Sequence, residues 1–132
     1  PIFEAAYNGL PVISPAWGGQ CDFLYMPVKD KKGKIKNTPM FTTVSYEIKQ
    51  IQKEAVWEGV LQKDSNWCFP IEWNYKKSLR EVTKNYGTAK AKATKLQNFV
   101  ADEFTNEIQY SKMVNALNIT GEVNESSIQV FD

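Results

Sequence analysis

Hydrophobic and polar positions follow different periods in different parts of this chain. Residues 2–8 are predicted to form a short helix, because Pro1 suits the first helical position and Gly9 suits the residue just past a helix end. The apolar run at 11–14 is closed by Pro15 and soon by a Gly-Gly pair. That pattern predicts a buried strand ending in a loop.

The middle of the chain carries strand signals. Residues 21–28 are apolar and aromatic and lead into a charged, glycine-containing stretch at 29–34, which predicts a hairpin with an exposed turn. Residues 41–51 are rich in β-forming side chains and predict one returning strand, and 67–69 predict a last short strand. The segment 55–61 fits a strand and a short helix equally well, so both readings stay open.

From residue 72 onward the apolar spacing becomes helical. Steps of three and four along 71–86 predict a helix that ends near Gly87. A second predicted helix has apolar residues on one side and directs three lysines toward solvent: Lys90, Lys92 and Lys95. A third has an apolar face along 108–117, and residues 119–132 are polar and predict a loose tail or an added edge strand. Short strands followed by packed helices predict an α/β architecture.

Composition narrows the classes of function. The chain has 132 residues, 42% of them hydrophobic, which is enough for the core of one domain. Its 16 basic and 15 acidic residues nearly cancel, so the overall charge does not indicate a nucleic acid or an anionic membrane as the main partner. The sequence contains neither an apolar run long enough to span a membrane nor a signal-peptide pattern, and we expect a cytoplasmic setting.

The absence of histidine excludes several kinds of catalytic and metal-binding site. Without any histidine, this chain cannot supply a Ser-His or Cys-His nucleophile system or an imidazole zinc site. Cys21 and Cys68 lack the spacing of a metal pair, and we interpret them as reduced core thiols.

The most informative stretch lies at the start of the chain. It reads Pro-x-x-Glu-Ala-x-x-x-Gly-x-Pro-Val-Ile over residues 1–13, followed by Gly18, Gly19 and Asp22. A carboxylate near the start of a short helix, at the open end of an α/β sheet, can accept hydrogen bonds from ribose hydroxyls. Glu4 has that position, although it could instead only favour the positive end of the helix dipole. The glycines are explained better by turns that need unusual φ angles than by ligand contact.

This stretch resembles the donor-site signature of retaining GT-B glycosyltransferases of group 1. The resemblance implies a partial Rossmann-like C-terminal domain at 1–118, with an inserted β-hairpin at roughly 23–66 and helices after it. It also implies that Glu4 binds the ribose of a UDP-, GDP- or ADP-sugar, with Gly9, Gly18 and Gly19 in the donor-site loops and no cofactor. The first glutamate of the family's pair, its diphosphate-binding residues and its acceptor domain would precede Pro1. We therefore expect a fragment that is inactive alone.

A second hypothesis is a non-catalytic module that binds glycan or protein. It rests on aromatic residues that could stack on sugars, although packing in a core or domain interface is the simpler explanation. These residues are Trp17, Trp57, Trp67 and Trp73, with Tyr25, Tyr46, Tyr75 and Tyr86. The lysines of 29–36 are most simply a solvated turn, with contact to lipid-linked or phosphorylated acceptors as the alternative. A truncated sheet would leave an apolar edge uncovered, so we also expect self-association.

Overall fold

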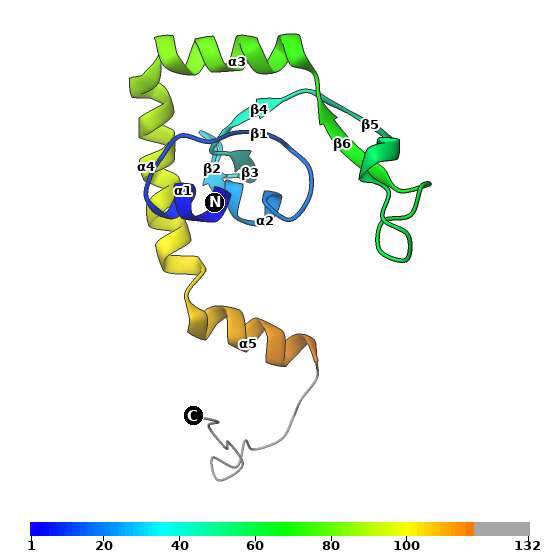
Figure 1. Ribbon diagram of the computed structural model, residues 1–132. Helices are drawn as coiled ribbons and strands as arrows, with labels where there is room; N and C mark the ends of the chain where they lie inside the picture. Colours follow the sequence, from blue (N-terminus) through cyan, green and yellow to red (C-terminus); the bar gives the residue numbers. More distant parts are fainter. Residues whose placement is uncertain (118–132) are drawn as a thin grey trace. The chain divides into compact units, whose positions relative to one another are not determined.

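The computed structural model describes residues 1–117, and the predicted tail at 119–132 lies outside them. The fold is mixed α/β, and the strands of the described part form three two-stranded sheets (Figure 1). The chain divides into two compact units, residues 1–102 and the part from Glu103 onward, which are described separately.

The first unit begins with a helix and a strand where the sequence predicted them, although only the middle residue of the strand, Ser14, is buried. Helix α1 covers Ile2–Tyr7 and strand β1 covers Ile13–Pro15. Strand β1 pairs in parallel with β4 (Thr42–Val44), with Ile13 opposite Thr42. Because parallel strands need a long crossover, the residues between them must leave the sheet and return. They form the short helix α2 (Cys21–Leu24) and a hairpin.

A hairpin with an exposed turn forms as predicted, but its strands differ: residues 21–24 are helical, and the returning strand is 35–39 instead of 41–51. Strands β2 (Tyr25–Lys29) and β3 (Ile35–Pro39) are antiparallel. Asp30 organises the turn, since its Oδ1 accepts hydrogen bonds from the backbone N–H groups of Lys32 at 2.8 Å and Lys34 at 3.0 Å. Gly33 has a φ of 78°, a conformation that side chains other than glycine rarely adopt.

The prediction of a single strand over 41–51 was wrong. The chain forms β4 and then a separate strand β5 (Tyr46–Gln50), which pairs antiparallel with β6 (Asn66–Pro70). Ser45 separates the two because its N–H donates to Oδ1 of Asn74 at 2.7 Å and its carbonyl accepts from the N–H of Ile71 at 2.8 Å. Both backbone groups of Ser45 are therefore bonded to the start of the following helix instead of to a strand.

Residues 55–61, for which the sequence allowed a strand or a short helix, form neither a strand nor an α-helix. A 3-10 turn, η1, covers Lys53–Ala55, and a tight turn follows in which Trp57 and Leu61 form an isolated bridge. Gly59 lies within this turn with a φ of 79°. The whole segment connects β5 to β6 and carries exposed apolar side chains.

The three helices appear where the spacing predicted them, with one boundary corrected. They are α3 (Glu72–Lys84), α4 (Tyr86–Glu103) and α5 (Asn106–Ala116). Gly87 does not end a helix but lies in the first turn of α4. The break comes at Asn85, whose carbonyl accepts hydrogen bonds from the N–H groups of Thr88 and Ala89. Helix α5 begins at Thr105, whose hydroxyl accepts from the N–H of Ile108, as at many helix N-caps.

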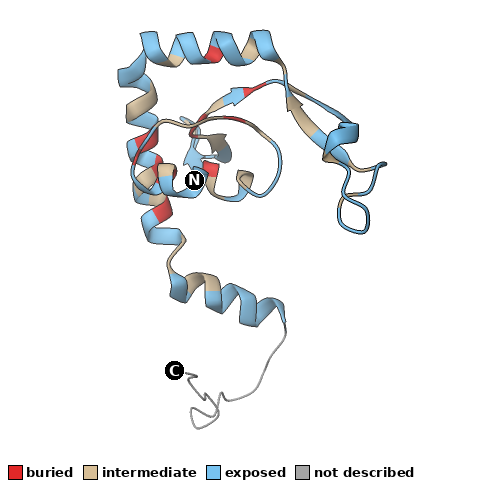
Figure 2. Ribbon diagram, in the orientation of Figure 1, coloured by how far each residue is buried: buried red, intermediate tan, exposed pale blue. Residues whose placement is uncertain are grey.

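The core of the first unit lies between α4 and the strands. The largest fully buried side chains are Leu24, Leu96 and Val100, and Figure 2 shows the buried positions along α4. The apolar stripe predicted for α3 is less covered, since Tyr75 and Leu79 remain 45% and 46% exposed. Only Ser78 of α3 is buried. An amphipathic pattern therefore predicted the helix correctly without predicting how much of it is covered.

Asn74 should anchor the junction between β4, β5 and α3. We expect Asn74→Ala to destabilise the chain by about 1 kcal/mol, because the Ser45 N–H loses its acceptor. Urea unfolding followed by circular dichroism measures the change. Asn98→Ala on the exposed side of α4 is the control and should change stability by less than about 0.5 kcal/mol. Equal effects of the two substitutions would show that the Ser45 contact has no special role.

Candidate functional site around Glu4

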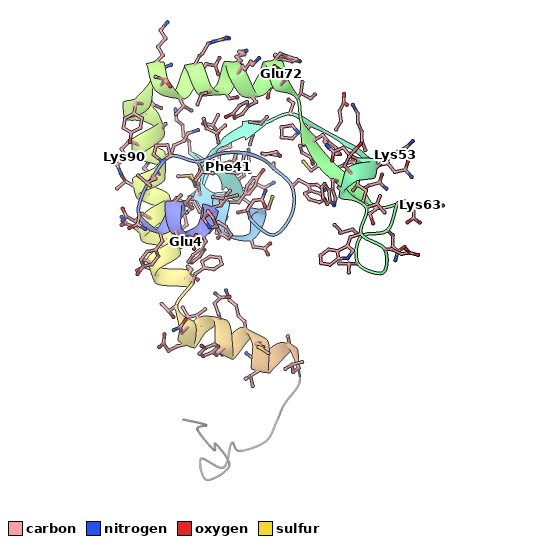
Figure 3. All side chains as sticks on the ribbon, in the orientation of Figure 1. Glu4, Phe41, Lys53, Lys63, Glu72 and Lys90 are labelled. Atoms are coloured by element: carbon pink, nitrogen blue, oxygen red, sulfur yellow. The ribbon has the colours of Figure 1, made fainter. Side chains whose placement is uncertain are left out.

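Glu4 lies in the first turn of α1 with its side chain in solvent. The helix has six residues and no side-chain cap, and 71% of the Glu4 side chain is exposed. Figure 3 labels Glu4 on this helix. Its carboxylate forms an ion pair with the amino group of Pro1. Glu4, the candidate ribose-binding residue, is therefore accessible to a ligand, and its carboxylate is negatively charged.

In the 132-residue chain, the free amino group of Pro1 also changes the acidity of Glu4. Its hydrogen bond to the carboxylate is the largest influence that holds the pKa of Glu4 below the ordinary value of 4.5, followed by a backbone hydrogen bond and the positive charge of Pro1. Each of these favours the ionised form. A glutamate with the ordinary pKa is already ionised at neutral pH, so Glu4 can only accept hydrogen bonds there with or without this amino group.

Gly9 is fixed by contacts with α4. Its φ is 63°, and its carbonyl accepts a hydrogen bond of 2.5 Å from Nζ of Lys90. A Cβ atom at this position would lie 2.5 Å from Oε1 of Gln97. Its φ angle therefore favours glycine, and any other residue would also require the end of the Gln97 side chain to move. The prediction that Lys90 faces solvent was wrong, because this lysine is half-buried against Gly9.

In the loop after β1, hydrogen bonds hold the first residues, whereas the two glycines that follow are exposed to solvent. Nε2 of Gln20 lies 3.3 Å from both Oγ of Ser14 and the carbonyl oxygen of Pro15, and the hydroxyl of Tyr46 donates to the carbonyl of Ala16. Gly18 has a φ of 81°, whereas Gly19 has no positive φ. No atom comes within 4 Å of a Cβ built on Gly19. Turn geometry therefore explains Gly18 but not Gly19, which lies in open space.

An aromatic contact joins the two halves of the motif. The rings of Phe3 and Phe23 meet edge to face with centroids 5.2 Å apart. Phe3 adjoins Glu4 in α1, and Phe23 belongs to α2, the helix that follows the Gly18–Gly19 loop. The first turn of α1 is thereby joined to the end of that loop. Gly9 lies elsewhere, at the other end of α1 against α4.

Several residues that shape this region escaped the sequence reasoning. Gln20 and Tyr46 hold the loop, and Phe3 with Phe23 joins the helices, yet none has a local signature of such a role. Cys21 and Cys68 are half-buried free thiols, and burial raises the pKa of Cys68. Within residues 1–117 no cluster of acidic or cysteine side chains could hold a metal ion, and no helix there is long and apolar enough to cross a membrane.

Comparison with known proteins gave no match to a family model, a curated protein or a solved structure. A functional interpretation therefore depends on the motif residues and on the geometry around Glu4.

Substituting Gly9 should be costly, and substituting Gly19 should not. We expect Gly9→Ala to lower the free energy of unfolding by about 2 kcal/mol, because a positive φ strains alanine and Gln97 must move. Gly19→Ala should change it by less than about 0.5 kcal/mol. Chemical denaturation measures both variants, and an unaffected Gly9→Ala protein would contradict the packing against α4.

In the 132-residue chain, neutralising the amino group of Pro1 should raise the pKa of Glu4 toward its ordinary value. Because the folded-state pKa is depressed, the ion pair contributes stability above the unfolded pKa and loses it as the pH falls through the folded pKa. Titration of the glutamate side-chain carbons by NMR, before and after acetylation of Pro1, measures the change. Glu107 is the internal control, because its lowered pKa comes from its own backbone hydrogen bond and from Thr105. Equal shifts at both glutamates would refute this cause.

Proposed function

We propose that this chain is the last part of the donor-binding domain of a retaining GT-B glycosyltransferase, with a partial Rossmann-like fold. The intact enzyme would transfer a sugar from a nucleotide diphosphate, and Glu4 would bind the donor ribose. The observation that carries the proposal is the joining of an exposed, ionised Glu4 to the Gly18–Gly19 loop through Phe3 and Phe23. That loop follows the carboxyl end of β1, a strand in parallel pairing, and ligands of α/β sheets bind at such ends.

The physical role of Glu4 in this proposal is limited to binding. An ionised carboxylate can accept hydrogen bonds from two hydroxyl groups at once, and such charge-assisted bonds are the stronger ones. The groups that stabilise the leaving diphosphate would be supplied by a part of the enzyme outside residues 1–132. Accordingly, the 132-residue chain alone should bind UDP, GDP or ADP weakly or not at all.

The test uses the full-length product of the gene that encodes this chain. Calorimetry first identifies which of UDP, GDP and ADP binds. Glu4→Gln should then weaken its binding roughly 10- to 100-fold, as expected for loss of a charge-assisted hydrogen bond. Glu72→Gln is the matched control, because Glu72 is also an acid in the first turn of a helix and is paired with Lys76 (Figure 3).

The 2′,3′-dideoxy form of the same diphosphate makes the test specific for ribose. Loss of the hydroxyl groups should weaken binding to the unmodified protein but have little further effect on the Glu4→Gln variant, because the two changes remove one interaction. Additive effects of the two changes would refute a ribose contact by Glu4. Tight nucleotide binding by the 132-residue chain alone would instead contradict the assignment of the diphosphate site to another part of the enzyme.

A second candidate function is supported by the turn between β5 and β6. Trp57 is 66% exposed and Val60 is 61% exposed there, so one turn presents two large apolar side chains to solvent. A non-catalytic module could use this turn to bind a glycan or a protein. Saturable quenching of tryptophan fluorescence by a glycan without nucleotide, lost in Trp57→Ala and retained in Glu4→Gln, would favour this function over the first.

A further inference from the structure

A groove separates the β2–β3 hairpin from α4 in the first unit. It has a volume of about 580 Å³, within the range of roughly 300–1,000 Å³ typical of small-molecule sites. One wall comes from both strands of the hairpin and the residue that follows them, and the other from the first half of α4. It contains neither Glu4 nor the Gly18–Gly19 loop, so the donor-site proposal does not involve it.

The walls of the groove are mainly aliphatic. Met26 and Val28 come from β2, Met40 follows β3, and Ala91 belongs to α4. No aromatic ring lines the groove, so stacking of a base or of a sugar has no platform there. Flexible methionine side chains adapt to apolar ligands of irregular shape. These walls fit an alkyl chain better than a nucleotide or a sugar.

The charged residues of the groove are all cationic. Lys29 lies at the end of β2, and Lys92 and Lys95 lie on α4; no acidic residue lines the groove. Among residues 1–117, these three lysines take part in no ion pair. The rest of the hairpin turn, 30–36, adds to the field, because it contains four further lysines against one aspartate, which pairs with Lys36. Glu81 lines an adjoining hollow beside Lys92 and is the acidic group that partly offsets this charge.

We propose that this groove binds an anionic amphiphile, a molecule with an alkyl chain and a phosphate or carboxylate head. The chain lies against Met26, Met40 and Ala91, and the head meets Lys92 and Lys95. Burial of an alkyl chain supplies the affinity, because apolar surface is removed from water. The lysines supply the preference for an anion, and their long aliphatic stems extend the apolar wall. The concave shape favours a single molecule over a flat membrane surface.

The methionines provide a direct test in the whole chain. Only Met26, Met40 and Met113 are present, and Met113 belongs to α5 of the second unit. In protein with ¹³C-labelled methionine methyl groups, dodecyl phosphate below its micelle concentration should shift the Met26 and Met40 signals saturably. The Met113 signal should stay unchanged. Dodecyl maltoside has the alkyl chain but no charge, and inorganic phosphate has the charge but no alkyl chain. Each should shift the Met26 and Met40 signals at least about fivefold less at the same concentration.

Charge reversal tests the role of the lysines. Lys92→Glu/Lys95→Glu should weaken dodecyl phosphate binding at least about fivefold, because two attractions become repulsions. Lys53→Glu/Lys63→Glu makes the same charge change near the β5–β6 turn and should leave binding within about twofold (Figure 3). Methionine spectra without ligand report whether each variant keeps the fold.

Three results would overturn the proposal. One is equal binding of dodecyl maltoside and dodecyl phosphate, because the lysines would then have no part in selection. Another is a shift of Met113 as large as those of Met26 and Met40, which indicates unspecific detergent association. The third is binding of anionic phosphatidylserine vesicles with no response to monomeric dodecyl phosphate, which would make the lysine-rich face a membrane contact instead of a ligand groove.

Discussion

The parallel pairing of β1 with β4 is the constraint on which the first unit depends. It forces the intervening residues to cross from one end of a strand to the start of the next. Two backbone hydrogen bonds close this crossover, from Met40 N–H to the carbonyl of Leu24 at 3.0 Å and from Thr42 N–H to the carbonyl of Val12 at 2.9 Å. The first bond fixes the end of the hairpin to α2, and the second fixes the start of β4 to the residue before β1. The groove beside the hairpin and the Gly18–Gly19 loop therefore both derive their positions from this pairing.

Local signals in the sequence predicted most of the elements, and long-range contacts explain the errors. The hairpin turn could be recognised from Asp30 and Gly33, because every contact that forms it lies within a few residues. The break at Ser45 could not, since its partner Asn74 lies in a helix that begins much later in the chain. Gly87 failed as a stop signal because a glycine costs a helix only about 1 kcal/mol, which other contacts can offset.

In the candidate site, too, the sequence pattern located residues but could not predict their long-range contacts. Sequence pattern identified Glu4 and the glycines, and the structure assigns them different surroundings: Glu4 and Gly19 are open to solvent, whereas Gly9 is packed against α4. Residue type and spacing could not separate these cases, because contact with Gln97 and Lys90 depends on the packing of α1 against α4. The sequence also could not predict the contact between Phe3 and Phe23, although this contact joins α1 to α2 within the motif.

Net charge was a poor guide to the surface. A formal charge of +1 did not indicate a nucleic acid or an anionic membrane as the main partner, yet Lys29 of the hairpin and Lys92 and Lys95 of α4 line one groove. Because charges interact over only about 8 Å at physiological ionic strength, a ligand responds to the groups around it and not to the sum over the molecule. Acidic residues elsewhere, such as those of the β5–β6 turn, balance the total without neutralising the groove. The distribution of charge over the fold thus carries information about ligands that composition cannot.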